Sequence, residues 1–96
     1  MTRCCEVLER LRGKTLVTAE SLTGGGIGAA LTAVPGSSSV YKGGVISYTN
    51  WVKHTVLRVP EEILDRYGAV SAQTSAAMAS GARSLLQAVC ILKYVL

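Results

Sequence analysis

The chain has 96 residues, enough for one small domain with a thin hydrophobic core. Its net charge of +4 is modest, and its ten Lys and Arg residues form no block, which argues against nucleic-acid binding. Hydrophobic residues make up 49% of the sequence and charged residues only 17%. We therefore expect some apolar surface to be shared with another chain, or with a part of the fold that is absent.

The cysteines and the N-terminal residues indicate in which cellular compartment the protein is expected. Cys4, Cys5 and Cys90 lack the spacing of a metal site, and adjacent cysteines rarely bridge each other. The N-terminus lacks the apolar core of a signal peptide, and no apolar run approaches the length of a membrane span. We expect a cytoplasmic protein with reduced thiols, without metal or membrane association.

The first third of the chain predicts a helix, a strand and a second helix. Residues 5–12 have amphipathic helical spacing that ends at Gly13, and residues 15–18 have strand character. A glycine-rich turn at residues 20–26 then leads into a helix of small residues at 27–34. A nucleophile candidate, a serine, lies in this turn between strand and helix.

The residues after 34 continue the alternation of strands and helices. Residues 35–39 are a loop by composition, 43–48 a second strand, and 51–58 a short helix that ends before Pro60. A helix at 60–67 begins with Pro60 and two acids and ends at Gly68.

A longer helix begins after Ser71, its expected N-cap, and residues 89–96 favour a third strand. The predicted buried face of this longer helix consists of Ala72, Ala76, Ala79, Ala82 and Leu86. The order of elements indicates an α/β domain over residues 1–96, with helices in layers around a mixed sheet.

The turn at residues 20–26 predicts a site for an anion. It holds Glu20, Ser21, Thr23 and three glycines, and it exposes backbone N–H groups where a helix begins. The anion could be a phosphate or the oxyanion of an acyl-transfer intermediate. The alternative is a flexible glycine turn in which Ser21 is the N-cap of the helix.

Four motifs, in order and at natural spacing, carry a family resemblance: residues 18–25, 34–38, 43–50 with Lys53, and 68–71. Together they resemble the CinA C-terminal domain family, over about Leu11 to Gln87. That family includes nicotinamide-nucleotide amidases, which convert nicotinamide mononucleotide to nicotinate mononucleotide and ammonia. The resemblance implies an α/β serine amidohydrolase that self-associates and needs neither metal nor cofactor.

The resemblance also implies site residues. Ser21 matches the nucleophile, Lys53 the base, and Tyr48 lies in a segment that lines the same site. The residues implied in substrate binding are Glu20, Thr23, Gly24, Gly25 and Asn50.

The chemistry requires these residue types. A serine hydroxyl is a weak nucleophile and needs a base, which a lysine can supply once its pKa falls well below about 10.4. Taken without the family, Lys53 reads as an exposed helix lysine and Tyr48 as a half-buried strand aromatic. Glu20 is open between a charge at a helix start and a residue that orients the site. His54, next to Lys53, stays open as an alternative base.

The chain also departs from the family pattern. The family domain continues after the long helix into a strand and a second glycine turn that faces the first, and residues 89–96 do not resemble that continuation closely. We interpret the chain as a C-terminally truncated domain. The alternative function is therefore a catalytically inactive module for self-association or protein binding.

Overall fold

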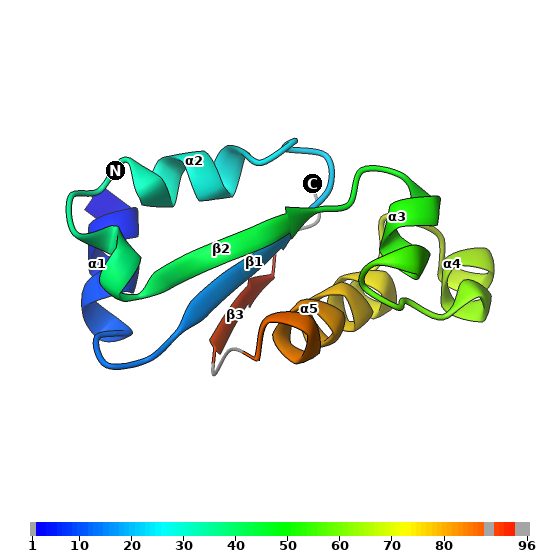
Figure 1. Ribbon diagram of the computed structural model, residues 1–96. Coiled ribbons are helices and arrows are strands. Elements are labelled where there is room, and N and C mark those ends of the chain that lie inside the picture. Colours follow the sequence, from blue (N-terminus) through cyan, green and yellow to red (C-terminus); the bar gives the residue numbers. More distant parts are fainter. Residues whose placement is uncertain (1, 88–89, 94–96) are drawn as a thin grey trace.

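A parallel sheet with helices on both faces forms the core of the computed structural model, which describes residues 2–87 and 90–93 (Figure 1). The strands are β1 (Leu16–Glu20), β2 (Tyr41–Ile46) and β3 (Cys90–Lys93), in the order β2-β1-β3. The predicted α/β class is confirmed. The prediction of a mixed sheet is wrong for the described strands, because β1 pairs in parallel with both neighbours.

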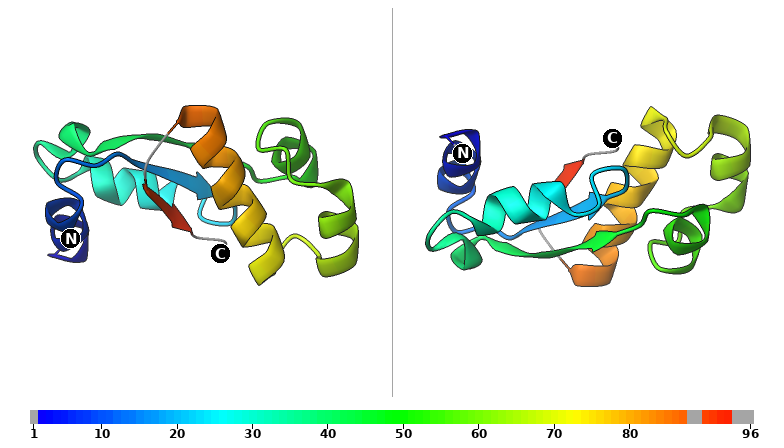
Figure 2. Two further views of the ribbon diagram at one scale, coloured as in Figure 1. Left: turned by 90° about the horizontal axis from the view of Figure 1, so that it is seen from below. Right: turned by 90° about the horizontal axis from the view of Figure 1, so that it is seen from above.

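Helices cover both faces of this sheet and its two ends. They are α1 (Thr2–Arg10), α2 (Gly26–Thr32), a 3-10 helix η1 (Ser37–Ser39), α3 (Asn50–Thr55), α4 (Glu61–Tyr67) and α5 (Ala72–Leu86). Figures 1 and 2 show α2 on one face of the sheet and α5 on the other, with α1 beside one end of the strands. The short helices α3 and α4 lie beyond the end of β2 (Figure 2).

The central strand β1 is buried on both faces, and its two-residue period divides its side chains between them. Leu16 packs in a cluster on the α1 and α2 side, together with Leu8, Leu31, Val40 and Tyr41. Val17 and Ala19 pack on the α5 side, together with Leu57, Val59, Leu64, Met78 and Ala82. Because neighbouring side chains alternate, Glu20 falls on the α2 side, and Ser21 follows it on the opposite side.

The predicted elements are found with altered ends. β1 continues to Glu20, two residues beyond the predicted strand. The loop at residues 35–39 contains η1, and the helix predicted at 51–58 ends at Thr55, after which Arg58 has a positive φ of 57°. Of the third strand, Cys90–Lys93 is confirmed, and its other predicted residues lie outside the described part.

The helix α5 begins as predicted but buries a different face. Ser71 is its N-cap, and the Ser71 hydroxyl accepts a hydrogen bond from the Thr74 N–H. Ala79 and Ala82 are buried as predicted, whereas the expected burial of Ala72, Ala76 and Leu86 is wrong. Thr74 and Met78 are buried instead. The Thr74 hydroxyl donates to the Gly68 carbonyl, and Met78 packs in the hydrophobic core.

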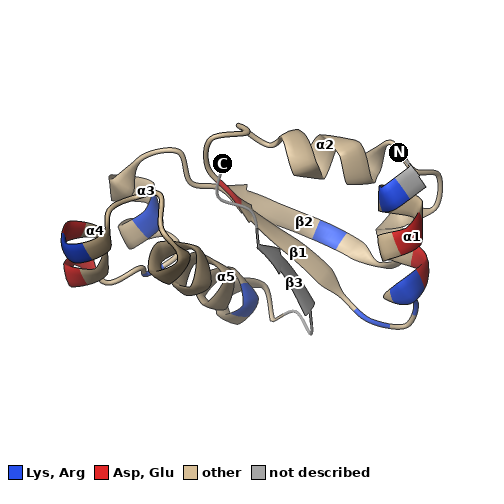
Figure 3. Cartoon of the chain, turned by 180° about the vertical axis from the view of Figure 1, so that it is seen from behind, with Lys and Arg blue, Asp and Glu red and all other residues tan. Residues whose placement is uncertain are grey.

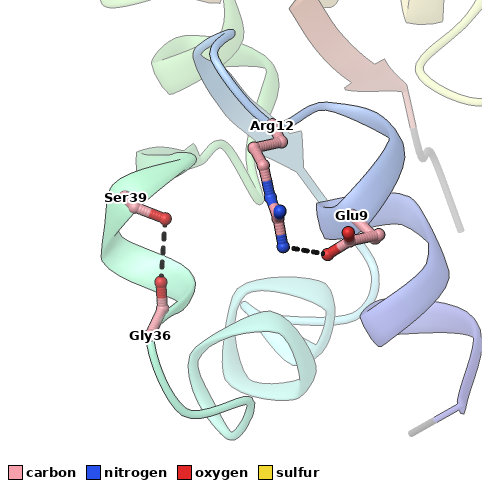
Figure 4. Close-up of polar contacts among 4 residues, drawn as sticks. All are labelled: Glu9, Arg12, Gly36 and Ser39. Atoms are coloured by element: carbon pink, nitrogen blue, oxygen red, sulfur yellow. Dashed lines mark hydrogen bonds and ion pairs between the residues drawn. The ribbon is translucent and has the colours of Figure 1, made fainter.

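The end of the molecule near α1 has contacts that are mostly at the surface. The Ser39 hydroxyl donates to the Gly36 carbonyl at 3.0 Å, and the Arg12 guanidinium pairs with Glu9 at 2.6 Å (Figure 4). Because both members of the ion pair are exposed, the pair contributes little to stability.

Charges are distributed over several elements. Figure 3 shows basic and acidic residues together on α1 and α4, and isolated basic positions on β2 and α5. No helix within the described residues is long and apolar enough to cross a membrane.

Gly81 of α5 provides a test of the packing between α5 and the segment after α3. A Cβ on Gly81 would overlap the Leu57 carbonyl group. At an open helix position a glycine-to-alanine change stabilises by about 1 kcal/mol. Here we expect Gly81→Ala to lower the free energy of unfolding instead, by about 1–3 kcal/mol, because the clash displaces backbone.

Urea denaturation measures this change, and the exposed Ser80→Ala on the same helix is the control. A Gly81→Ala protein as stable as the parent would contradict the close approach of α5 to Leu57.

Candidate functional site

The candidate site lies where β1 and β2 end side by side. Glu20 is in register with Ile46, so the residues that follow, Ser21 and Ser47, leave the sheet at the same edge. The N–H and the hydroxyl of Ser47 both donate to the Glu20 carbonyl, at 2.6 and 3.1 Å. The carboxyl ends of parallel strands are where open α/β sheets commonly place their sites.

A buried lysine contacts the nucleophile candidate at this edge. Lys53 Nζ lies 2.9 Å from Ser21 Oγ, 2.7 Å from the Ser47 carbonyl oxygen and 3.3 Å from the Tyr48 carbonyl oxygen. Lys53 is 1% exposed and Ser21 is 9% exposed. The structure therefore brings together two residues that are 32 positions apart in the sequence.

The short helix α3 places Lys53 at this position. The Thr49 hydroxyl caps the helix by accepting from the Val52 N–H, and the Thr49 carbonyl accepts from the Lys53 N–H. After α3 the chain folds back, and the Val59 N–H donates to the Lys53 carbonyl. The lysine backbone is thus held at both its N–H and its C=O groups.

The surroundings of Lys53 favour an amine that accepts a proton. Burial lowers the pKa of Lys53 below its ordinary value of 10.5, because desolvation disfavours the charged form. A neutral amine has two N–H donors and one lone pair. When charged, Lys53 donates to all three oxygens, the Ser21 hydroxyl included. Once the amine is neutral, the carbonyls of Ser47 and Tyr48, which can only accept, would take its two donors and leave the lone pair for the hydroxyl hydrogen of Ser21.

Glu20 lies on the other side of β1, beneath the start of α2. It is 3% exposed, and its carboxylate accepts from the Ile27 N–H at 2.6 Å and the Gly28 N–H at 3.1 Å. The N-cap position itself is Gly25, with no side-chain cap, so the alternative in which Ser21 caps the helix is wrong. The physical reason is the alternation along β1, which turns Glu20 toward α2 and Ser21 away from it.

The glycine turn has a backbone that other residues would adopt at a cost. Gly24 and Gly25 have φ of 62° and 103°, in the left-handed region. A Cβ on Gly25 would come within 2.8 Å of the Ile46 side chain. Within the described residues, the N–H groups of Leu22, Thr23 and Gly25 are given no hydrogen-bond acceptor.

The structure places the other predicted site residues less centrally. Thr23 lies in the turn, and its hydroxyl donates to Glu20 at 2.9 Å. Tyr48 contributes its carbonyl to Lys53, while its side chain is 65% exposed. Asn50 begins α3 and lines a hollow between α3 and α4.

His54 joins α3 to the start of α4. Its Nδ1 lies 2.8 Å from the Val59 carbonyl oxygen, and its Nε2 lies 3.4 Å from a Glu61 carboxylate oxygen. Both ring nitrogens thus contact groups outside the pair formed by Ser21 and Lys53.

One residue of the site, Ser47, was not anticipated from the sequence. It is completely buried, its carbonyl holds Lys53, and its hydroxyl fixes the end of β1. The sequence places Ser47 inside the strand predicted at residues 43–48, so no local signal singled it out; β2 ends one residue before it, at Ile46. In the part of the chain that the structure describes, no three His, Cys, Asp or Glu side chains gather as metal ligands.

The geometry defines an α/β domain in which a serine and a lysine meet at the carboxyl edge of a parallel sheet. A model of the CinA C-terminal domain matches residues 2–92. A CinA-like protein of Parasynechococcus marenigrum (strain WH8102) is 65% identical over 74 residues, which are 77% of this chain and 18% of the relative. A putative competence-damage inducible protein of Desulforudis audaxviator (strain MP104C) is 57% identical over 74 residues, with the same two shares of 77% and 18%.

The solved structures agree with the sequence matches. The competence damage-inducible protein A (ComA) from Klebsiella pneumoniae subsp. pneumoniae MGH 78578 has a TM-score of 0.88 and 38% identity, covering 92% of this chain and 56% of that one. The chain therefore belongs to the CinA C-terminal domain family. It spans about a fifth of the length of these curated relatives and about half of the solved chain.

The lowered pKa of Lys53 has a consequence for stability. Between the folded pKa and the unfolded value of 10.5, the unfolded chain binds more protons, so the free energy of unfolding rises with pH. This contribution is complete above the unfolded value and is lost as the pH falls through the folded value. Lys53→Met, which fills the same space without a titrating group, abolishes it.

Urea denaturation of the parent and of Lys53→Met over a pH series up to 10.5 tests this expectation. We expect the difference in unfolding free energy, parent minus variant, to grow with pH in the window directly below 10.5. A constant difference would show that burial does not shift this lysine.

Proposed function

We propose that the chain is an amidohydrolase that converts nicotinamide mononucleotide to nicotinate mononucleotide and ammonia, with Ser21 as nucleophile and Lys53 as base. The observation that carries the proposal is the 2.9 Å contact between Lys53 Nζ and Ser21 Oγ, with the lysine buried. Membership of the CinA C-terminal domain family supports it. We place the reaction in the cytoplasm, in keeping with the free thiols of Cys4 and Cys5.

In the first half of the proposed reaction the Lys53 amine takes the proton of the Ser21 hydroxyl. Ser21 Oγ then forms a bond to the carboxamide carbon, and the C=O electron pair moves onto the oxygen. When this oxyanion collapses, the C–N bond breaks, and the Lys53 ammonium gives its proton to the departing nitrogen, which leaves as ammonia. The acyl group stays on Ser21.

In the second half water replaces ammonia. Lys53 accepts a proton from the water as the oxygen bonds to the acyl carbon, and the bond to Ser21 Oγ then breaks. Lys53 returns the proton to that oxygen, which restores the hydroxyl and releases the carboxylic acid. The same amine thus accepts and then returns a proton in each half. Its three oxygen neighbours can accept the hydrogens of the charged ammonium form.

The turn that follows β1 would supply the electrostatic stabilisation. The N–H groups of Leu22, Thr23 and Gly25 are the candidate donors to the oxyanion. The glycines at 24 and 25 hold these groups in a conformation that L side chains rarely adopt. The exposed Tyr48 ring and the Asn50 amide are candidates for contact with the nucleotide.

A second candidate function is supported by the exposed apolar side chains. Large hydrophobic residues lie exposed around the site and elsewhere: Leu22, Ile46, Tyr48, Trp51, Val56, Tyr67, Val70, Leu85 and Leu86. Exposed apolar surface of this kind is typical of interaction sites. We propose that the chain self-associates. In the alternative function this association occurs without catalysis.

Ammonia release from nicotinamide mononucleotide tests the proposed reaction. We expect Ser21→Ala to abolish turnover because the attacking oxygen is gone. Lys53→Arg should abolish it as well, since a guanidinium does not release its proton near neutral pH. Ser38→Ala and Lys14→Arg, both at exposed positions, are the matched controls and should keep the parent's rate.

Turnover by Ser21→Ala equal to that of the parent would contradict the nucleophile, and turnover by Lys53→Arg would contradict the base. A folded parent that releases no ammonia but self-associates in sedimentation would support the non-catalytic module.

A further inference from the structure

We propose that Glu20 is a positioning residue, whose buried carboxylate fixes the turn that carries Ser21 and does not contact the substrate. The inference rests on the proposed role of Ser21 as nucleophile. It replaces the substrate contact that the family resemblance implies for Glu20 with an indirect role, argued from the hydrogen bonds of its carboxylate.

Both carboxylate oxygens of Glu20 are occupied within the protein. Oε1 accepts from the Thr23 hydroxyl at 2.9 Å and from the Ile27 N–H at 2.6 Å. Oε2 accepts from the Gly28 N–H at 3.1 Å and lies 3.4 Å from the Thr18 hydroxyl. A carboxylate has about four lone-pair sites, so these four donors leave none for a substrate. The side chain is also 3% exposed.

Glu20 also lines a small hollow between α2 and β2, and its hydrogen bonds hold the carboxylate at the edge of that hollow. The Tyr41 hydroxyl lies 2.8 Å from the Thr18 hydroxyl, which extends the hydrogen bonds to the start of β2. Gly28 lets the helix approach closely, because a Cβ there would lie 2.9 Å from the Tyr41 hydroxyl and 3.2 Å from Glu20 Oε2. The carboxylate is therefore held in one position against the start of α2.

Glu20 connects the two reacting groups through separate parts of the residue. Its side chain binds Thr23 and the first N–H groups of α2, and so fixes both ends of the turn after Ser21. Its carbonyl accepts both donors of Ser47, whose own carbonyl holds Lys53 Nζ. A change in the carboxylate shifts the turn and leaves the backbone support of the lysine in place.

Glu20→Gln tests this role because it keeps the size of the side chain and replaces one acceptor oxygen with an NH₂ donor facing N–H groups. We expect the second-order rate of Ser21 labelling by a fluorophosphonate to fall about 10- to 100-fold, as for other small misplacements of a reacting group. We expect kcat for nicotinamide mononucleotide to fall by a similar factor, with KM unchanged.

Thr32→Val is the control, since it removes a hydroxyl of α2 that donates only to the Gly28 and Ala29 carbonyls and makes no bond to Glu20 or to the turn. It should label at the parent's rate, which separates positioning from a general loss of stability. If Glu20→Gln does not fold, Thr23→Val takes its place, because it removes the side-chain bond between Glu20 and the turn.

The outcomes are distinct. Labelling of a folded Glu20→Gln at the parent's rate would overturn the positioning role, and so would a raised KM with unchanged kcat, which would indicate a substrate contact. A parent that is not labelled at Ser21 would overturn the proposed function and, with it, the need for positioning.

Discussion

The burial of the Lys53 amine is the constraint on which the rest of the site depends. A lysine that is 1% exposed is stable in the fold only if its polar hydrogens have partners. Three oxygens within 3.3 Å meet that demand, two of them backbone carbonyls and the third the hydroxyl of Ser21. The carbonyls accept only, so they determine which way a neutral amine directs its lone pair.

The central strand provides the second half of the arrangement. Its alternation sends Glu20 toward α2 and Ser21 toward Lys53, so consecutive residues perform separate tasks. The carboxylate satisfies the N–H groups at the start of α2, which a serine N-cap satisfies in many helices. Ser21 is thereby left to contact the lysine.

Parts of this fold could be predicted from the sequence because their signals are local. The N-cap at Ser71 and the helix end at Gly68 depend on adjacent residues, and both are observed. The buried face of α5 could be predicted only in part, at Ala79 and Ala82, because alanines occur on several sides of the helix and do not distinguish them. Thr74 is buried through a contact with Gly68 that helical spacing does not reveal.

The residues of the site could be predicted from the sequence only in part. The family resemblance singled out Ser21 and Lys53, whereas the residues alone favoured an exposed lysine, the usual state of that side chain. Ser47 could not be found from the sequence, since its contribution comes from a backbone carbonyl and from the parallel register of two strands. Tertiary contacts of this kind have no local signature.

The most direct test of this account is the titration of Lys53 itself, followed by NMR on protein labelled at the lysine Cε carbons. The Lys53 resonance is assigned by its loss in Lys53→Met. We expect Lys53 to titrate below 10.5, as a desolvated amine that can accept the proton of Ser21. A resonance that titrates at or above 10.5 would show a lysine that stays charged, and would contradict its role as the base.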